Sequence, residues 1–430
     1  MSLPFGTVDT AFERFLQELP ADFRELAFEF KAFTRSRKIK TPEQLLRVVM
    51  NYCGVDLVLR ETAGNFTLLE ERISDTAIQK RLKACVPWVK ALLGQMLGAA
   101  AAPLLEGHLR FVVGDGSTVQ GPGAQGTEHR LHLAVDLVRL ELIFAKVTDA
   151  HAGESLRHYP LQDGDVMVVD RGYNSARALI ECADLGVAVV VRYNPHSLTL
   201  YDATGAKIDW LAELQGTADT ERCRPVRVRA KDEFIEGYLH GCRLPPAQAA
   251  EARRRVQAQA RKKGRQAQAR TLALAEWVLV LSTLPPAVLP TATVLALYRV
   301  RWQVELVIKR LKSIVNIDHL RARQGSALAD LYLHGKLLYA WVLEKWARRR
   351  CGDGWNRLDG PRRATPWRVW KLLRQELATA ISGVRHWNLD RWPACLAVMQ
   401  ERPRRRQLQT LPDRVNRLIA QCQALGMSNI

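Results

Sequence analysis

Three carboxylates, Asp115, Asp170 and Glu305, are the residues of this sequence with the clearest potential for chemistry. Asp115 and Asp170 each end a short apolar run that reads as a strand. Side chains at the ends of neighbouring strands meet at one edge of a sheet, where many enzymes bind their ligands. The structural alternative is a turn residue or a helix cap, which is the commoner role of a single strand-end aspartate.

Glu305 belongs to a segment with helical periodicity that begins near residue 293 and runs past residue 315. At about 100° per residue, one face of this helix carries the polar and aromatic side chains Tyr298, Arg301, Trp302, Glu305, Lys309 and Lys312. Apolar residues fall on the opposite face, so the helix can pack on a sheet while Glu305 points toward the strand ends. A solvated polar face is the structural alternative, although such a face seldom combines Tyr and Trp with Arg and Glu.

Three carboxylates without a His or Cys cluster favour hard divalent cations, Mg²⁺ or Mn²⁺. Two such ions about 3.5–4 Å apart suit phosphodiester chemistry, because one activates the nucleophile and the other stabilises the leaving oxygen. The sequence therefore predicts two ions per active site, held by the three carboxylates. The nearby residues His129, His132, His151 and Glu154 show no metal-ligand spacing, and we interpret them either as structural or as residues that surround and orient the ligands.

The elements around the carboxylates indicate a mixed α/β sheet. Three successive strands are expected at residues 108–115, 130–137 and 141–147. A strand at 165–170, a helix at 175–185 and a strand at 187–192 follow. A three-stranded meander followed by alternating helix and strand fits the ribonuclease-H-like class of sheet.

The charge balance points to a polyanionic partner. The 430 residues include 63 Lys and Arg against 44 Asp and Glu, a formal net charge of +19, which favours a nucleic acid. Residues 253–270 form a basic, helix-prone segment, in which Arg261, Lys262, Lys263 and Arg265 are the candidate phosphate contacts. A solvated face or flexible arm is the alternative interpretation of such a run.

Residues 1 to about 100 have helical periodicity, with helices expected at 26–33, 42–58 and 74–97. Ser74 is a typical N-cap, and Gly64-Asn65 predicts a break upstream of it. A capped basic helix after a glycine-containing turn is the order of a helix-turn-helix module, which would bind DNA. An ordinary helical hairpin has the same pattern.

The sequence also bears on the cellular compartment. No apolar run approaches the roughly 20 residues of a membrane span, and the N-terminus lacks the apolar core of a signal peptide. The eight cysteines are scattered without a C-x-x-C pair, as is usual for reduced thiols. We therefore expect a cytoplasmic bacterial protein without a membrane partner, associated with the nucleoid when bound to DNA.

The spacing Tyr298-x2-Arg301-x3-Glu305-x6-Lys312 resembles the Y-R-E-K motif of DDE transposases of bacterial insertion sequences, the IS-four family. Gly-Asp115-Gly-Ser-Thr is similar to the first aspartate block of that family, and Asp170-Arg-Gly-Tyr to the second. The resemblance covers about residues 110–320. It implies a ribonuclease-H-like core interrupted by a largely β insertion. The helical regions at the two ends match no motif of the family, and with them the sequence divides into five segments. These are a helical, DNA-binding N-terminal region (1–105), the first part of the core (106–195), the insertion (196–290), the second part of the core (291–350) and a helical C-terminal region (351–430).

The resemblance also implies roles for individual residues. Asp115, Asp170 and Glu305 match the metal-binding triad. The phosphate of the terminal or hairpin nucleotide would be gripped by Tyr298, Arg301 and Lys312, with Lys309 on the same helix face as a further DNA contact. Trp277 resembles the insertion tryptophan that stacks a flipped base, and Trp302 a second aromatic that helps to expel it. Without the resemblance, a Trp that opens an apolar strand is more often a core residue.

The function implied is cut-and-paste transposition. Such an enzyme binds terminal inverted repeats and cleaves double-stranded DNA, either by hydrolysis or through a hairpin intermediate. It then transfers the 3′ ends to target DNA, acting as a homodimer in the synaptic complex. Two alternatives stay open. One is a ribonuclease-H-like nuclease without strand transfer, and the other is a domesticated DNA-binding protein with relic catalytic residues.

Overall fold

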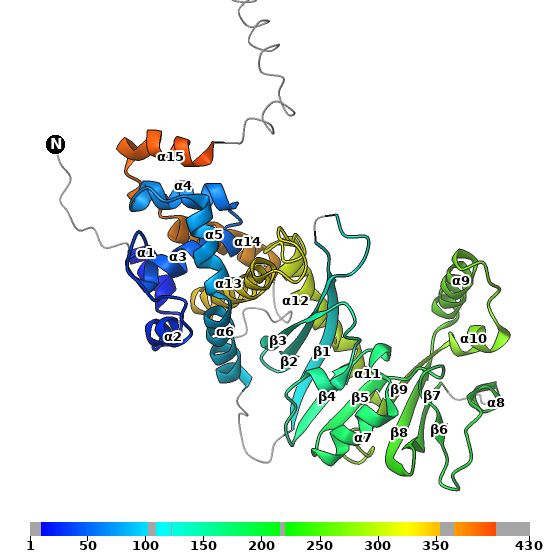
Figure 1. Ribbon diagram of the computed structural model, residues 1–430. Coiled ribbons are helices and arrows are strands. Elements are labelled where there is room, and N and C mark those ends of the chain that lie inside the picture. Colours follow the sequence, from blue (N-terminus) through cyan, green and yellow to red (C-terminus); the bar gives the residue numbers. More distant parts are fainter. Residues whose placement is uncertain (1–9, 102–108, 122, 216–219, 353–364, 401–430) are drawn as a thin grey trace, which may run out of the picture. The chain divides into compact units, whose positions relative to one another are not determined.

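The computed structural model describes residues 10–101, 109–121, 123–215, 220–352 and 365–400. The chain forms two compact units (Figure 1), one from the described residues up to Trp88 and from Glu376 on, the other from Val89 to Gln375. Both predicted parts of the core and the predicted insertion fall within the second unit. The two terminal regions are divided between the units: their described residues up to Trp88 and from Glu376 on belong to the first unit, and those from Val89 on and up to Gln375 belong to the second. Residues 1–9, 102–108, 353–364 and 401–430 lie outside the described part of the chain.

The first unit is helical. Its described elements are α1 (Thr10–Leu16), α2 (Phe23–Glu29), α3 (Pro42–Cys53), α4 (Leu59–Leu69), α5 (Asp75–Ala84), η3 (Val384–His386), η4 (Leu389–Arg391) and α15 (Trp392–Met399). The unit boundaries fall within α6 (Val86–Ala101) and α14 (Pro366–Ser382). The expected cap is confirmed, since Ser74 Oγ accepts a hydrogen bond from the Ala77 amide at 3.2 Å.

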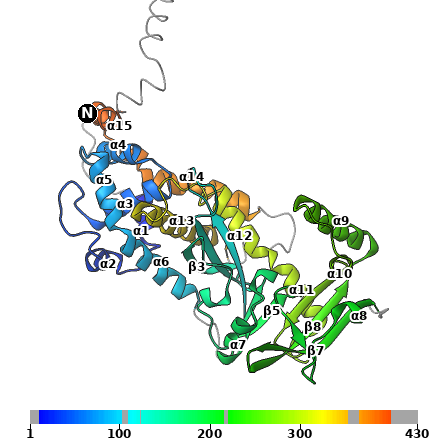
Figure 2. The same ribbon diagram turned by 45° about the vertical axis from the view of Figure 1, so that its right-hand side comes forward.

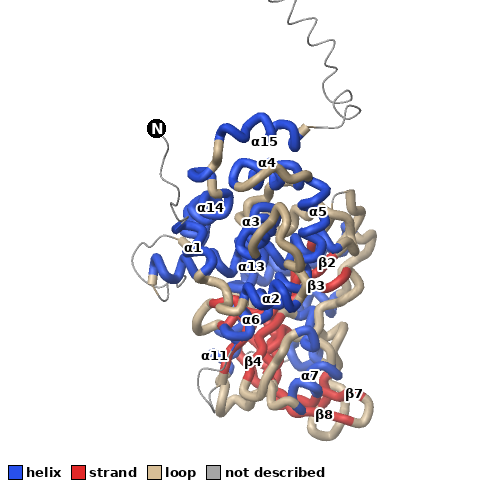
Figure 3. Tube along the Cα trace, turned by 60° about the vertical axis from the view of Figure 1, so that its left-hand side comes forward, coloured by secondary structure: helices blue, strands red, loops and turns tan. Residues whose placement is uncertain are grey.

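The expected break at Gly64-Asn65 is wrong, because both residues lie inside α4. Helix α15 lies along α4 (Figure 3), and a Cβ at Gly64 would stand 3.1 Å from Cys395 Sγ. The glycine therefore permits close packing of two helices that are distant in sequence. Asn65 is buried, and its side-chain amide donates to the Ser382 carbonyl at 2.8 Å.

The second unit contains a nine-stranded sheet among the described residues, in the order β3-β2-β1-β4-β5-β9-β8-β7-β6. Its first five strands are β1 (Arg110–Val119), β2 (His129–Asp136), β3 (Glu141–Asp149), β4 (Asp165–Val169) and β5 (Ala188–Arg192). Strands β1, β2 and β3 form an antiparallel meander, whereas β1, β4 and β5 run parallel. Short η1 (Leu156–His158) and η2 (Arg171–Tyr173) and helix α7 (Ala176–Asp184) connect them.

The insertion continues this sheet. Its elements are β6 (Leu200–Tyr201), α8 (Trp210–Gln215), β7 (Glu221–Ala230), β8 (Glu233–Arg243), α9 (Pro246–Lys262), α10 (Ala269–Leu274) and β9 (Trp277–Ser282). Strand β9 pairs with β5 on one side and with β8 on the other. The basic segment is helical as expected, up to Lys262. The short helix α8 is an addition to the pattern that the sequence predicted.

The predicted long helix is confirmed as α11 (Thr291–Val300) followed directly by α12 (Trp302–Ser313), with a turn at Arg301. Helix α11 packs against β4, β5 and β9, and α12 packs against β1 and β2, so the pair crosses the sheet (Figures 1 and 2). The long buried helix α13 (Ala327–Cys351) follows. Its Lys336 donates to the Val315 carbonyl at 2.5 Å, which anchors the chain just past the end of α12.

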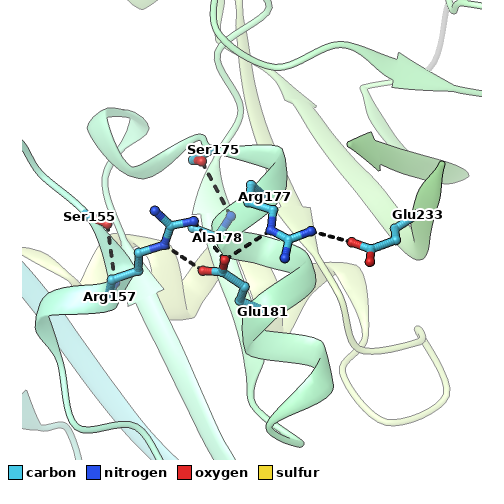
Figure 4. A network of polar contacts seen from close by, with 7 residues as sticks. All are labelled: Ser155, Arg157, Ser175, Arg177, Ala178, Glu181 and Glu233. Carbon is cyan, nitrogen blue, oxygen red and sulfur yellow. Dashed lines mark hydrogen bonds and ion pairs between the residues drawn. The ribbon is translucent and has the colours of Figure 1, made fainter. Parts of the chain in front are cut away.

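A network of charges joins the core to the insertion (Figure 4). Arg157, in η1, holds Glu181 of α7 with two hydrogen bonds of 2.6 and 2.7 Å. Arg177 of α7 contacts the same Glu181 at 3.1 Å and reaches Glu233 of β8 at 2.6 Å. Each exposed pair contributes little by itself, but the network links three elements.

The predicted fold class is confirmed as a mixed α/β unit with helical regions at both ends of the chain. One detail differs, because β1 does not end at Asp115 but continues to Val119, paired with β2 as far as His129. The β-prone residues Thr118 and Val119 extend the strand past the glycines. Within the described residues, no helix has the length and apolarity needed to cross a bilayer.

Candidate active site

The first two carboxylates are level with each other on adjacent strands. Parallel pairing of β1 with β4 joins Arg110 to Asp165 and Val113 to Val168, an offset of 55 residues. Asp115 and Asp170 are also 55 residues apart. The same register therefore places Asp170, just past β4, beside Asp115 in the middle of β1. Two side chains at matching positions of parallel neighbours point to the same side of the sheet.

Two glycines make room around Asp115. A Cβ at Gly114 would stand 2.1 Å from Met167 Cε and 3.2 Å from Tyr159 Cζ, so a larger residue here would displace the buried side chain of Met167 on β4. The Asp115 carboxylate accepts a hydrogen bond from the Gly116 amide at 2.8 Å. The Tyr159 hydroxyl donates to the Asp115 carbonyl at 3.3 Å, which holds the strand in place. The position of this aspartate is thus set by packing and by backbone contacts.

Glu305 is joined to Asp115 through Arg301. The Arg301 guanidinium donates to Asp115 Oδ2 at 3.2 Å and to Glu305 Oε1 at 2.5 Å. The side chains of Arg301 and Asp115 are only 12% and 16% exposed, whereas Glu305 is 41% exposed. Arg301 therefore supplies the positive charge that allows two carboxylates to stand at one partly buried site.

The other residues of the motif also contact the two strands. The Tyr298 hydroxyl donates to Asp170 Oδ1 at 3.3 Å, and the Arg171 amide donates to the same oxygen at 2.6 Å. Lys312 Nζ donates to the Thr118 carbonyl at 3.1 Å. The structure thus brings together the polar face of α11 and α12 with the ends of β1 and β4, as the periodicity predicted.

Burial raises the pKa of Asp115 to about 6 from its ordinary 3.8. The amide of Gly116 and the charge of Arg301 oppose the rise, and the negative charges of Asp170 and Glu154 add to it. The negative charge of this carboxylate therefore still costs energy with Arg301 beside it, and a further cation would stabilise it. Raised pKa values of this kind are typical of functional sites.

Glu154 lies closer to these carboxylates than its sequence position suggested. A Cβ at Gly172 would stand 1.8 Å from Glu154 Oε2, and one at Gly116 would stand 3.5 Å from Glu154 Cγ. Gly116 directly follows Asp115, and Gly172 lies two residues after Asp170. Both glycines thus leave space for the Glu154 side chain. The position of Glu154 in the sequence does not predict this contact. The glycines that follow the two motif aspartates are the feature of the sequence that could have indicated it.

A divalent metal fits the chemistry of these donors, because three carboxylates and no nitrogen or sulfur ligand suit Mg²⁺ or Mn²⁺. Among the described residues, however, no three His, Cys, Asp or Glu side chains already form a metal-binding group. Arg301 lies between Asp115 and Glu305. A metal bound by all three carboxylates would compete with Arg301 for Asp115 Oδ2 and Glu305 Oε1.

The remaining predicted residues lie apart from this cluster or face solvent. Trp302 is 45% exposed, and Lys309 of α12 is also exposed. Arg261, Lys262, Lys263 and Arg265 are all exposed, at and beyond the end of α9. Trp277 is only 5% exposed and packs in the core beside Gly241. Its burial favours the core interpretation, and base stacking by this ring stays a prediction that requires the ring to be uncovered.

Comparisons with known proteins agree with this geometry. A family model described as "Transposase DDE domain" matches residues 107–339. The chain is 31% identical over 325 residues to the putative transposase InsL for insertion sequence element IS186A of Escherichia coli K12. It is also 31% identical over 326 residues to the transposase for insertion sequence element IS421 of Escherichia coli. Each match covers 73% of this chain and 87% of the relative.

The fold, the three carboxylates and these matches define a transposase with a DDE domain, an enzyme class that acts on DNA. The chain belongs to the DDE transposase family, as the resemblance to enzymes of bacterial insertion sequences predicted. Membership implies the use of a divalent metal and a DNA substrate.

Proposed function

We propose that this chain catalyses cut-and-paste transposition of its own insertion sequence. It would bind the terminal inverted repeats, cleave the DNA with two Mg²⁺ or Mn²⁺ ions, through a hairpin intermediate, and join the 3′ ends to target DNA. The observation that supports this most directly is the level placement of Asp115 and Asp170, with Glu305 linked to them by Arg301. The enzyme would act in the cytoplasm, on nucleoid DNA, as a homodimer in the synaptic complex.

The protein's own residues would prepare the site and hold the substrate. Asp115, Asp170 and Glu305 would hold the ions, which when bound activate the attacking oxygen and stabilise the leaving one. Once released from Glu305, Arg301 is free to donate to a DNA phosphate beside the carboxylates, because its planar guanidinium suits that geometry. Tyr298 keeps Asp170 oriented through its hydroxyl. Lys312 adds a positive charge next to β1.

Incubation of the protein with DNA that carries the element's ends, in Mg²⁺ or Mn²⁺, tests this function. Denaturing gels should show nicked ends and hairpins, and a plasmid target should acquire joined ends. Cleavage without joined products would favour the nuclease alternative. If the wild-type protein binds ends but never cuts them in either metal, the transposition proposal fails and the domesticated DNA-binding protein becomes the better interpretation.

The basic segment of the insertion gives a prediction about DNA affinity. Arg253 is paired with Glu276 at 2.6 Å, and Arg255 is paired with Glu251. The side chains of Arg261, Lys262, Lys263 and Arg265 make no hydrogen bond or ion pair with any residue that the structure describes. These four cations therefore remain available for phosphates.

Replacing those four residues with Gln should weaken binding of duplex DNA and reduce its salt dependence. Each phosphate that the variant no longer neutralises lowers the slope of log K against log salt by about 0.9. Titrations across a range of salt concentrations measure the slope. The double Gln variant of Arg253 and Arg255 is the control, since those guanidiniums already have carboxylate partners. An unchanged slope in the fourfold variant would identify the segment as a solvated face.

A further inference from the structure

The first unit contains a basic cleft between residues 31–39 and helix α5. Its volume is about 740 Å³. Six cationic side chains line it, and the described lining residues include no carboxylate: Lys31, Arg35, Arg37, Lys38, Lys80 and Arg81. A concentration of one sign of charge in a hollow raises the local potential for an anion above that of a flat surface.

Most of these cations have no carboxylate partner. Lys38 pairs with Glu71 at 2.5 Å, and the Arg81 guanidinium donates to the Arg35 carbonyl at 3.1 Å. The other four, Lys31, Arg35, Arg37 and Lys80, make no side-chain hydrogen bond or ion pair with the described part of the chain. Clustered like charges repel one another, so an external anion would stabilise the arrangement.

Lys31 supplies a separate observation. It follows the C-cap of α2 and has a φ of 56°, in the left-handed region. Helices often end with such a residue, and glycine is the usual choice because a Cβ is strained there. A lysine at this position costs conformational energy that glycine would avoid. Because the strained residue is also one whose charge lines the cleft, we interpret the Lys31 side chain as functional.

We propose that this basic cleft binds the sugar-phosphate backbone of duplex DNA. The inference rests on the proposed function, since it names a surface through which the transposase would hold its DNA. The lining cations are ligands for phosphates, and phosphate contacts position a protein on DNA without reading its sequence. The cleft would therefore contribute equally to the affinity for transposon ends and for unrelated duplexes.

The test compares two triple variants of the full chain that remove the same charge. In the cleft variant, Arg35, Arg37 and Lys80 are replaced with Gln. In the control, Arg14, Arg72 and Arg385 are replaced with Gln; these cations of the same unit are exposed and do not line the cleft. The salt slope of the cleft variant should fall by about 0.9 for each phosphate released, up to about 2.7, on both end DNA and unrelated DNA. The control should keep the wild-type slope.

Three results would overturn the proposal: an unchanged slope in the cleft variant, an equal decrease in both variants, or a decrease confined to end DNA. The last would indicate base readout by α5. These titrations are made without metal, so the cleft can fail while wild-type cleavage still supports the proposed function. If the wild-type protein neither binds nor cuts end DNA, the proposed function itself fails.

Lys31→Gly separates binding from folding. The substitution removes a charge from the cleft and relieves the left-handed backbone at the same time. The urea midpoint should stay constant or rise, while the salt slope falls by about 0.9. A wild-type slope in this variant would remove Lys31 from the site, and a lower midpoint would contradict the strain argument.

Discussion

Replacing Glu305 with Gln should lower DNA cleavage by roughly two to four orders of magnitude while binding of end DNA persists. Gln has nearly the same shape but lacks the charge of a metal ligand, and a correctly placed metal stabilises the transition state by several kcal/mol. About 1.4 kcal/mol corresponds to a factor of ten. Because this side chain is 41% exposed and Gln can still accept from Arg301, folding should change little.

Single-turnover cleavage on denaturing gels, together with gel shifts of end DNA, measures both effects. The matched control is Glu154→Gln, which removes a carboxylate that packs against Gly116 and Gly172 but is not one of the proposed ligands. Its cleavage rate should fall much less. Cleavage by the Glu305 variant at a tenth of the wild-type rate would refute the triad. Equal losses of activity at both positions would mean that the site depends on four carboxylates.

Asp115→Asn should abolish cleavage and yet stabilise the metal-free protein at pH 8. Burial raises the pKa of Asp115 from 3.8 to about 6 in the folded chain. A carboxyl with a raised pKa favours the folded state fully below pH 3.8, and this contribution is lost as the pH rises through 6. A shift of about two units corresponds to about 3 kcal/mol. Asn avoids that cost, although Arg301 then keeps only Glu305 as a charged partner, so the gain should be smaller than this limit.

Urea unfolding of the wild-type and variant proteins in EDTA, from pH 4 to pH 8, checks the expectation. The difference in midpoint should be small near pH 4 and should grow toward pH 8. A variant that is less stable than the wild type at pH 8 would show that the pairing with Arg301 outweighs the burial of the charge. Added Mn²⁺ should stabilise the wild type more than the variant, because binding to the folded state alone raises stability.

The relation of the three carboxylates was predictable from the sequence because it depends on local geometry. Strand periodicity identified β1 and β4, and helical periodicity placed Tyr298, Arg301 and Glu305 on one face. What periodicity does not contain is the partner of each side chain. Arg301 was expected to contact a phosphate, and in the protein alone it bridges two carboxylates. The position of a residue around the helix axis determines the direction in which its side chain points. Which residue that side chain contacts depends on how the helix crosses the sheet.

The errors have a common physical cause, since tertiary packing overrode local preference. Gly64 and Asn65 suggested a break, but α15 packs on the glycine and the Asn65 amide bonds to Ser382, more than 300 residues away. Asp115 suggested a strand end, but pairing with β2 carries β1 four residues further. The position of Glu154 depends on the space left by two glycines in other segments, which no local pattern reveals.

We expect that the insertion cannot be replaced by cutting the chain at residues 196 and 290 alone. Because β9 pairs with β5 on one side and β8 on the other, the insertion shields the backbone of a strand next to the one that precedes Asp170. Excision of residues 196–290 would leave β5 with unpaired amides and carbonyls along an apolar edge, a template for aggregation. Chimaeras between related transposases should therefore exchange β9 together with its β5 partner. The insertion and the core share one sheet, so the insertion cannot be exchanged as an independent module.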